Sequence, residues 1–351
     1  MEDKKKKIQA KGAGKVCFAA LEPYIEYNIP VPVQREVAGK RYVPYGLNNL
    51  YPQFLLDLYN ECSTLKAIID GNVDYVLGDD FTLDVPMDKV KAEELLREVT
   101  RDWYIFGYAF IQVIRNPLGE VKDLYCLPGE WVRTDKEHQA FWYCEDWYRR
   151  GFHNAAVYPA FMREGTDSAS VLMLRSGRGT YPAPLWGAAV KDAEMERKID
   201  DFHINELGNN FLSSLIVNFN NGVPDDEVKL EIERAWNEKH TGAENAGRAL
   251  LSFNQSVANR TTVERLGTDD FDKRYEALAR RSREQLFISF KAQPILFGLT
   301  SESNTGFSTQ EFGDLFRLYS KTMISPRQDM LKRAFAKIYG RDVLTITPFT
   351  I

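Results

Sequence analysis

Two stretches with helical periodicity, joined by a polar loop, occupy residues 266–339 and most constrain what this chain can fold into. In the first stretch, mostly apolar residues recur every three or four positions and so form a stripe along one side of a helix: Phe271, Tyr275, Leu278, Ser282, Leu286 and Phe290. Acidic residues come early in it and basic residues late, which suits the helix dipole. Pro294 cannot continue a helical ladder, so the sequence predicts a long helix that ends near Ala292.

The second stretch begins after residues 300–306, which are almost all Ser, Thr, Asn, Glu or Gly. Ser308 and Glu311 form a capping box that opens a helix. Its apolar stripe runs on to Ile338, and Pro326 inside the pattern predicts a kink. A simple αα-hairpin would explain both stretches. A long polar connection, however, is typical of a functional or disordered loop.

Composition bounds the class of protein. The 351 residues are 44% hydrophobic, enough for two or three domains, and the net charge of −5 gives no global sign of nucleic-acid binding. No apolar run approaches the ~20 residues of a membrane span. Lys4–Lys7 precede no hydrophobic segment and are interpreted as a solvated tail, with a nucleic-acid arm as the alternative. The four cysteines show no paired spacing and are expected to be free thiols in a reducing compartment.

The sequence of the first half of the chain predicts an extended arm followed by an α+β unit. Periodicity predicts helices over residues 53–60, 63–76 and 88–106, and strands over 81–85, 108–115, 121–127, 131–133, 139–145 and 171–175. Many of its aromatic residues are expected to fill sheets and interfaces. Stacking on sugars or bases is the alternative for them.

The second half opens with a long polar helix over residues 185–211, whose apolar stripe is thin. A helix of this kind rarely builds the core of a monomer, so it is expected to lie between subunits or beside water. Strands over 212–219 and 249–253, with a helix over 224–239 between them, predict a small α/β unit inserted before the two helical stretches.

Motifs of catalysis are not found. The sequence contains no P-loop, no G-x-S-x-G elbow and no H-E-x-x-H. The acidic pairs Asp269–Asp270 and Asp225–Asp226 are interpreted as helix starts and not as metal ligands. We therefore expect no enzyme, no cofactor and no metal site.

Four stretches, in this order and spacing, resemble the portal proteins of tailed phages, of the shorter family with a small or absent crown. Trp103–Phe110 (WYIFGYAF) is similar to the helix and first strand of the family's wing. The other three are Tyr181–Trp186 (YPAPLW), Trp236–Arg248 with its ENAGR ending, and Gln293–Gly298 (QPILFG). Gln293 departs from the family pattern, which usually has a second Pro there.

The resemblance implies a portal-type α+β fold with the following divisions: an N-terminal arm (1–52), an α+β wing (53–184), a first stem helix (185–212), a clip (213–265), a second stem helix (266–292), a tunnel loop region (293–307), and a tunnel helix with a short C-terminal tail (308–351). It also implies a ring of about twelve subunits at the capsid vertex. Double-stranded DNA would pass through this ring without sequence specificity.

Implied partners are further copies of the chain, the terminase large subunit, the major capsid or scaffolding protein and a tail adaptor. The protein would be made in the host cytoplasm and reside in the virion. Alternatives are another ring or adaptor protein of a phage or injection machine, or an α+β nucleic-acid enzyme. The enzyme would need convergent carboxylates or a nucleotide loop, and neither is found in the sequence.

Candidate site residues follow from these divisions. The tunnel loop would comprise Thr300, Ser301, Glu302, Ser303, Asn304, Thr305, Gly306 and Phe307. The clip would dock the motor through Asp225, Asp226, Glu227, Glu231 and Glu233. The stem would contribute Asp192, Glu194, Glu196, Arg280, Arg281 and Arg283. Lys and Arg side chains attract the phosphates of DNA, whereas acidic side chains repel them. The excess of acidic residues on the first stem helix is therefore expected to repel DNA.

Overall fold

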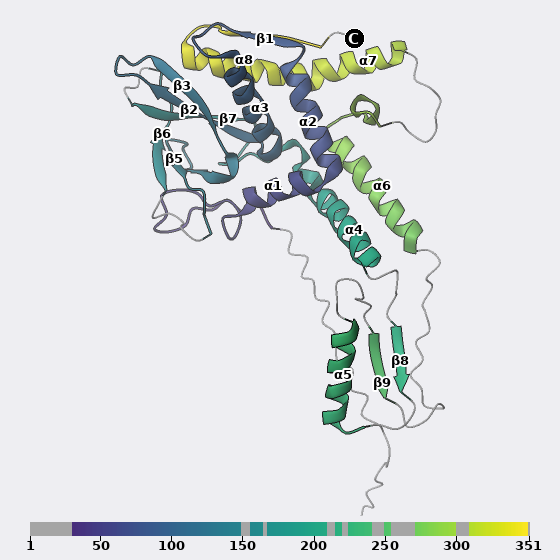
Figure 1. Ribbon diagram of the computed structural model, residues 1–351. Helices are drawn as coiled ribbons and strands as arrows, with labels where there is room; N and C mark the ends of the chain where they lie inside the picture. Colours follow the sequence, from purple (N-terminus) through teal and green to yellow (C-terminus); the bar gives the residue numbers. More distant parts are fainter. Residues whose placement is uncertain are drawn as a thin grey trace, which may run out of the picture.

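The computed structural model of the chain describes residues 30–148, 155–163, 167–208, 215–219, 224–240, 249–253, 271–299 and 309–349. Figure 1 shows a body of sheets and helices from which α4 (Val190–Gly208) and α6 (Phe271–Ser289) run outward side by side. A small unit of two strands and one helix lies beyond the outer ends of these helices. The predicted α+β architecture is confirmed.

The body contains α1 (Tyr51–Glu61), α2 (Ser63–Leu77) and α3 (Lys89–Phe106). Asp88 caps α3, because its side chain accepts hydrogen bonds from the backbone N–H groups of Val90 and Lys91. Gly107 ends α3 with a φ of 84°. A Cβ at this position would lie 2.7 Å from the carbonyl oxygen of Pro182. The turn from α3 into the next strand therefore requires glycine.

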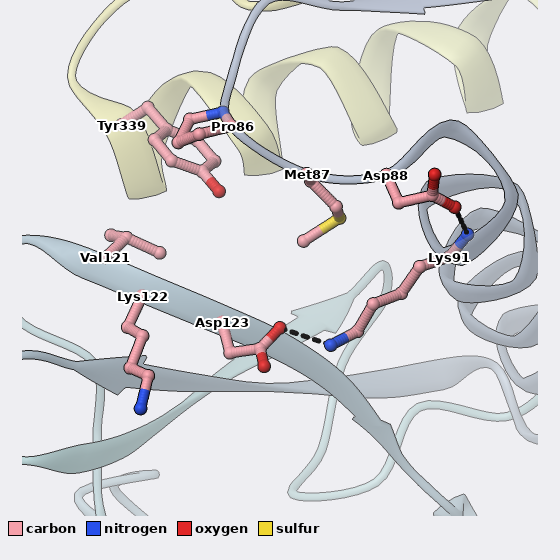
Figure 2. Close-up of a pocket in the computed structure, with 8 residues that line it drawn as sticks. All are labelled: Pro86, Met87, Asp88, Lys91, Val121, Lys122, Asp123 and Tyr339. Carbon is pink, nitrogen blue, oxygen red and sulfur yellow. Dashed lines mark hydrogen bonds and ion pairs between the residues drawn. The ribbon is translucent and has the colours of Figure 1, made fainter.

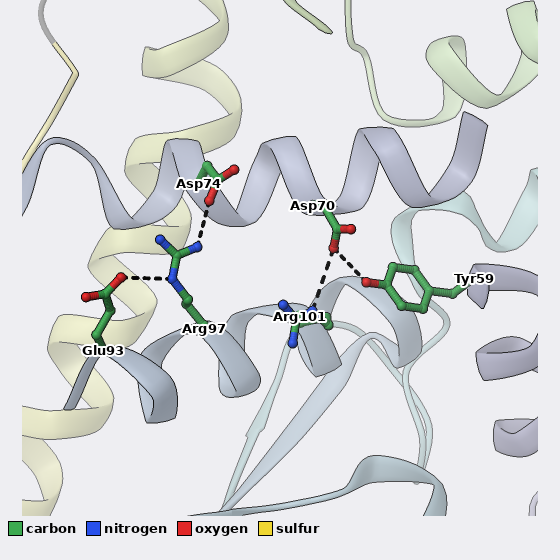
Figure 3. Close-up of polar contacts among 6 residues, drawn as sticks. All are labelled: Tyr59, Asp70, Asp74, Glu93, Arg97 and Arg101. Atoms are coloured by element: carbon green, nitrogen blue, oxygen red, sulfur yellow. Dashed lines mark hydrogen bonds and ion pairs between the residues drawn. The ribbon is translucent and has the colours of Figure 1, made fainter. Parts of the chain in front are cut away.

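Ion pairs join α2 to α3, as Figure 3 shows. Arg97 of α3 places Nη1 2.7 Å from Oδ1 of Asp74 on α2. One turn further along, Nε of Arg101 lies 3.7 Å from Oδ1 of Asp70, which also accepts a hydrogen bond of 2.6 Å from the Tyr59 hydroxyl. The charged partners are substantially exposed, and such pairs are worth about 0–1 kcal/mol each. They align the two helices more than they stabilise them.

Two three-stranded antiparallel sheets complete the body, in the orders β3-β2-β7 and β4-β5-β6. Their strands are β2 (Tyr108–Arg115), β3 (Val121–Leu127), β7 (Ala169–Arg175), β4 (Val132–Thr134), β5 (Ala140–Tyr143) and β6 (Ala156–Pro159). Phe110 in β2 pairs with Leu127 on one side and Met173 on the other. Nearly every side chain of β2 is buried, so β2 is the central strand of the core. The sequence analysis did not predict β6.

The buried guanidinium of Arg133 fastens the segment before α1 to the second sheet. Its Nε donates to Oδ1 of Asn49 at 2.7 Å, and Nη2 donates to the backbone oxygen of Asn49 at 2.6 Å. Its other face lies 5.0 Å from the centre of a Trp147 ring. Nearby, Tyr45 stacks on Tyr181 with 4.8 Å between ring centres. The end of the predicted extended arm is thus part of the core, which corrects the expectation.

The C-terminal part contains η5 (Pro294–Phe297), α7 (Thr309–Tyr319), η6 (Ser320–Ile324), α8 (Ser325–Tyr339) and β10 (Leu344–Thr347). The segment η6 is a π-helical turn between α7 and α8, and Pro326 lies in the first turn of α8. Because Pro326 has no N–H to donate, the regular α-helical ladder is interrupted just before it. The predicted kink is therefore present as a π turn.

The C-terminal segment is not a simple tail. Strand β10 pairs antiparallel with β1 (Asp80–Leu83), so that Phe81 lies opposite Ile346. Both side chains are buried. The sequence analysis predicted no strand in this tail, because a four-residue strand gives too little alternation to be recognised locally.

The small outer unit consists of β8 (Leu215–Phe219), α5 (Asp226–His240) and β9 (Ala249–Phe253). The two strands are parallel, with Leu215 opposite Ala249 and Phe219 opposite Phe253. A parallel pair needs a crossover connection, and α5 lies between the strands in sequence to provide it. The structure thus has the two strands and the helix predicted for this small α/β unit.

We expect the conservative substitution Arg133→Lys to destabilise the subunit by about 1–3 kcal/mol. A lysine cannot donate to both Asn49 oxygens from one planar group, so a buried acceptor loses its partner. Urea unfolding of the purified protein measures the change. The exposed Arg35→Lys is the control and should change stability by less than about 0.5 kcal/mol. Equal stability of the two variants would contradict this role.

Candidate functional site

The two outward helices pack on each other through an apolar seam. Near its outer end, Phe202 of α4 stacks on Tyr275 of α6, with 4.6 Å between ring centres and 23° between planes. Near the body, Leu286 and Phe290 are fully buried, and Phe290 lies 6.4 Å from the ring of Tyr104 in α3. The buried part of the predicted stripe therefore attaches α6 to its own subunit.

Glu196 of α4 caps the N-terminus of α2. Its Oε1 accepts hydrogen bonds of 3.1 Å from the Ser63 hydroxyl and from the backbone N–H of Thr64. The first N–H groups of a helix have no partner within the helix, and the dipole favours negative charge there. Burial and, after it, the Glu196 carboxylate raise the pKa of the neighbouring Cys62 thiol to about 12. This thiol is therefore protonated at neutral pH.

Arg197 ties α4 to α1. Its Nη1 lies 2.6 Å from Oε2 of Glu61, and its Nη2 lies 2.7 Å from Oε2 of Glu194. The hydrogen bonds that Arg197 donates to Glu194 and then to Glu61 raise the pKa of Arg197, so the guanidinium stays charged. Glu194 and Glu196 are each 8% exposed. Both carboxylates therefore make contacts inside the subunit, Glu194 with Arg197 and Glu196 with the N-terminus of α2.

The remaining stem candidates lie closer to solvent. Burial raises the pKa of Asp192 and Arg281 of α6 lowers it, so these two side chains interact across the helix pair. Arg280, Arg281 and Arg283 are all exposed. Within the described residues, neither Arg280 nor Arg283 forms an ion pair with a carboxylate of its own subunit.

The clip candidates lie on α5 and just before it. Asp225, Asp226, Glu227 and Glu231 are exposed. Oδ1 of Asp226 lies 2.7 Å from Nζ of Lys229, one turn along the helix. Glu233 is on the same helix, and its side chain is outside the described residues. Leu230 is 60% exposed among these charges, so the surface is acidic with an apolar element.

The tunnel loop candidates, residues 300–307, lie outside the described residues, but the segments on either side are well anchored. The Tyr75 hydroxyl of α2 donates to the backbone oxygen of Leu296 in η5. The ring of Phe297 lies 5.8 Å from that of Tyr75 and 6.1 Å from that of Tyr319 in α7. A Cβ at Gly71 would lie 2.8 Å from the Phe297 ring. This aromatic cluster holds η5 and α7 against α2.

A surface cavity of about 230 Å³ lies between β3, the segment before α3 and the end of α8 (Figure 2). Its lining residues are Pro86, Met87, Asp88, Lys91, Val121, Lys122, Asp123 and Tyr339. Nζ of Lys91 pairs with Oδ1 of Asp123 at 2.5 Å across it. None of the predicted site residues lines this cavity, so it is separate from the stem and clip.

Within the part of the chain that the structure describes, no group of three or more His, Cys, Asp or Glu side chains is arranged to hold a metal ion. The described helices include none with the length and apolar character needed to cross a membrane.

The stem contacts could not be identified from the sequence. Glu196 and its partner Ser63 are 133 residues apart, and Arg197 and Glu61 are 136 apart. Nothing in the local pattern around α4 indicates that two of its acids turn inward. The only available signal was the thin apolar stripe of this helix, which implies that other interactions hold it in place.

Comparison with known proteins identifies the family to which the chain belongs. A sequence profile of the phage portal protein family matches residues 80–341. No curated protein sequence matches the chain. The fold is similar to the neck of an empty gene transfer agent particle computed with C6 symmetry, with 12% identity, a TM-score of 0.55, and coverage of 90% of this chain and 86% of that one.

Two further structures are similar. The neck of the native gene transfer agent particle computed with C12 symmetry has 14% identity, a TM-score of 0.50 and coverage of 84% of each chain. An HK97 family phage portal protein from Corynebacterium diphtheriae has 10% identity, a TM-score of 0.51, and coverage of 84% of this chain and 94% of that one. These likenesses concern the fold.

The profile match begins at β1 and ends just after α8, so it includes the sheets, both outward helices and the small outer unit. It also contains all four stretches on which the resemblance was based. The chain therefore belongs to the phage portal protein family, and it is a portal protein of the capsid vertex.

Proposed function

We propose that this portal protein assembles into a closed ring of twelve subunits, through which the phage genome is packaged and later ejected. The observation that carries the proposal is the pair α4 and α6, which leaves the body together and has the small α/β unit beyond its outer end. The C12 symmetry used for the native gene transfer agent neck supports the subunit number. The thin apolar stripe of α4 supports packing against neighbouring copies.

The parts of the chain have distinct roles in this proposal. Residues 53–184 form the wing, α4 and α6 form the stem, and β8, α5 and β9 form the clip. Helices α7 and α8 border the channel, with residues 300–307 as the tunnel loop. The aromatic cluster around Phe297 supports a loop whose two ends are held while its middle contacts DNA.

DNA passes without sequence specificity and without tight binding. Each Lys or Arg placed on a phosphate adds salt-dependent attraction, which would slow translocation. The polar composition of residues 300–306, with Glu302 as the one charged side chain, supports weak contact through hydrogen bonds. The protein acts as a structural conduit with no catalytic site or cofactor of its own.

The acidic surface of α5 docks the terminase large subunit during packaging and a tail adaptor afterwards. Exposed carboxylates around Leu230 support a partner that offers basic side chains and an apolar contact. The wing meets the major capsid or scaffolding protein. Assembly takes place in the host cytoplasm, where the chain is made, before the ring becomes part of the virion.

The purified chain should form a ring near twelvefold with a central pore, because α4 and α6 expose Ile204 and Ile288, which are 67% and 64% exposed in the single subunit. Native mass spectrometry gives the subunit number, and electron micrographs down the symmetry axis give the pore. A folded monomer at micromolar concentration, with no larger species, is the result that would refute the proposal.

Reversing Glu227 and Glu231 to Lys should leave the ring intact and weaken binding of the packaging motor by about tenfold or more. The two residues are exposed one turn apart on α5, so their charges act together. The matched control reverses Glu94 and Glu137, which are exposed on the wing. Pull-down of the motor by purified rings measures the difference. If both variants bind the motor equally, another surface carries this contact.

Deleting residues 302–305 should preserve folding and ring formation, because shortening a loop changes closure entropy little. It should instead impair retention of packaged DNA or the final stage of filling. The control replaces the same four residues by Gly-Ser-Gly-Ser, which keeps the length and flexibility of the loop. Packaged DNA per particle is measured by DNase protection. Fully filled, infectious particles from the deletion would show that this loop is only a connector.

A further inference from the structure

The two outward helices carry opposite charge excesses. Helix α4 contains six acidic and three basic residues, and α6 contains five basic and three acidic residues. The ion pairs of α4 are those of Arg197 with Glu61 and Glu194 and of Lys198 with Asp201, all with carboxylates of α1 or of α4 itself. Their seam is held by rings and aliphatic side chains. Asp192 and Arg281 interact across the helix pair, and exposed charges such as Asp200, Arg280 and Arg283 are available to other surfaces.

The acidic charge collects on an edge formed by α1 and α4, which we call the acidic edge. It contains Asp57, Glu61, Glu194, Glu196 and Asp200 around the single guanidinium of Arg197. Burial and then Glu61 raise the pKa of Asp57, whereas burial and then Glu196 raise that of Asp200. His203 lowers the pKa of Asp200, but the net effect is still a raised pKa. This edge has more carboxylates than its own cations neutralise.

A second observation at the same edge is independent of the charge count. Oε1 of Glu196 caps α2, but Oε2 is buried and has no hydrogen-bond partner within the described residues. Glu196 is 8% exposed, so this oxygen is cut off from water in the single subunit. A buried carboxylate oxygen without a hydrogen-bond donor is costly, so positive charge placed close to this edge would stabilise it electrostatically.

The basic counterpart is the outer face of α6, which we call the basic face. Arg280 and Arg283 lie three residues apart and therefore on one side of the helix, and both are exposed. Ile288, seven residues after Arg281 and therefore on the same side of α6 as that arginine, is 64% exposed. Glu276 and Glu284 are exposed on the same helix, so the face is mixed but has a basic excess.

The two surfaces lie on opposite sides of the helix pair. Helix α4 contacts both α1 and α6, and Figure 1 shows α1 on one side of α4 and α6 on the other. We infer that the acidic edge of one subunit docks on the basic face of a second copy of this chain, with Asp57, Glu61 and Asp200 opposite Arg280 and Arg283. Such a contact joins different surfaces, and repetition of it gives the proposed ring when the rotation between neighbouring subunits closes.

This inference rests on the proposed ring and assigns its stem interface to particular residues. The arginines of α6 could otherwise meet the phosphates of DNA, which makes a second outcome measurable. The experiment uses two full-length variants. The edge variant carries Asp57→Lys and Asp200→Lys, and the face variant carries Arg280→Glu and Arg283→Glu. All four side chains are exposed, so both variants should fold, as circular dichroism will check.

Each variant alone should need at least about tenfold more protein than the unmodified chain to form rings, because like charges then meet at every contact. Mixed in equal amounts, the two should form rings again. The edge of the edge variant, now basic, then meets the face of the face variant, now acidic. At the next contact, the unchanged acidic edge of the face variant meets the unchanged basic face of the edge variant. Native mass spectrometry of the mixture should show both variants in one ring. Pairing within a subunit cannot produce this rescue.

The control for the face variant carries Lys122→Glu and Lys136→Glu, which lower the net charge by the same amount at exposed wing positions. It should form rings as the unmodified chain does. Neutral substitutions, Arg280→Gln and Arg283→Gln, should reduce the sensitivity of ring assembly to salt.

Folded single variants that assemble normally, or a mixture that fails to form rings, would overturn the inference and leave the proposed function standing. Normal rings of the face variant with poor DNA retention would likewise overturn it and assign the arginines to DNA. If the unmodified chain forms no ring, the proposed function fails together with this interface.

Discussion

The N-terminus of α2 lies against α4, and its first N–H groups have no acceptor within the helix. Glu196 supplies this acceptor, and the next residue, Arg197, reaches back to α1. Together they fix where α4 leaves the body and in which direction it runs. Because the clip is carried at the far end of α4, a small error at this junction would be multiplied along the length of the helix.

Such contacts do not have to add much stability. Burying charged groups costs desolvation free energy, which the ion pairs offset only in part. What they provide is geometry, since a carboxylate at a helix N-terminus and a guanidinium between two carboxylates have few alternative arrangements. The apolar seam between α4 and α6 holds the helices together, and the polar junction determines their orientation.

Much of the fold could be predicted where the signal is local. Strands β2, β3 and β9 have the predicted bounds, because alternation between Gly or Pro turns is a strong pattern. Features that depend on distant partners could not be found this way. Neither the burial of Arg133 nor the inward turn of Glu196 has a sequence signature, and a four-residue strand such as β10 is too short for one. Charged residues at the start of α5 were predictable, because helix starts favour acids whatever their function.

The pairing of β1 with β10 has a consequence for how the subunit is made. A chain is synthesised from its N-terminus, so β1 emerges from the ribosome long before residues 344–347 are available to pair with it. Until then β1 has an unsatisfied edge, and such edges favour aggregation with other chains. Completion of this sheet is a late, long-range folding step. A chain that lacks residues 344–347 therefore leaves the edge of β1 without its partner strand.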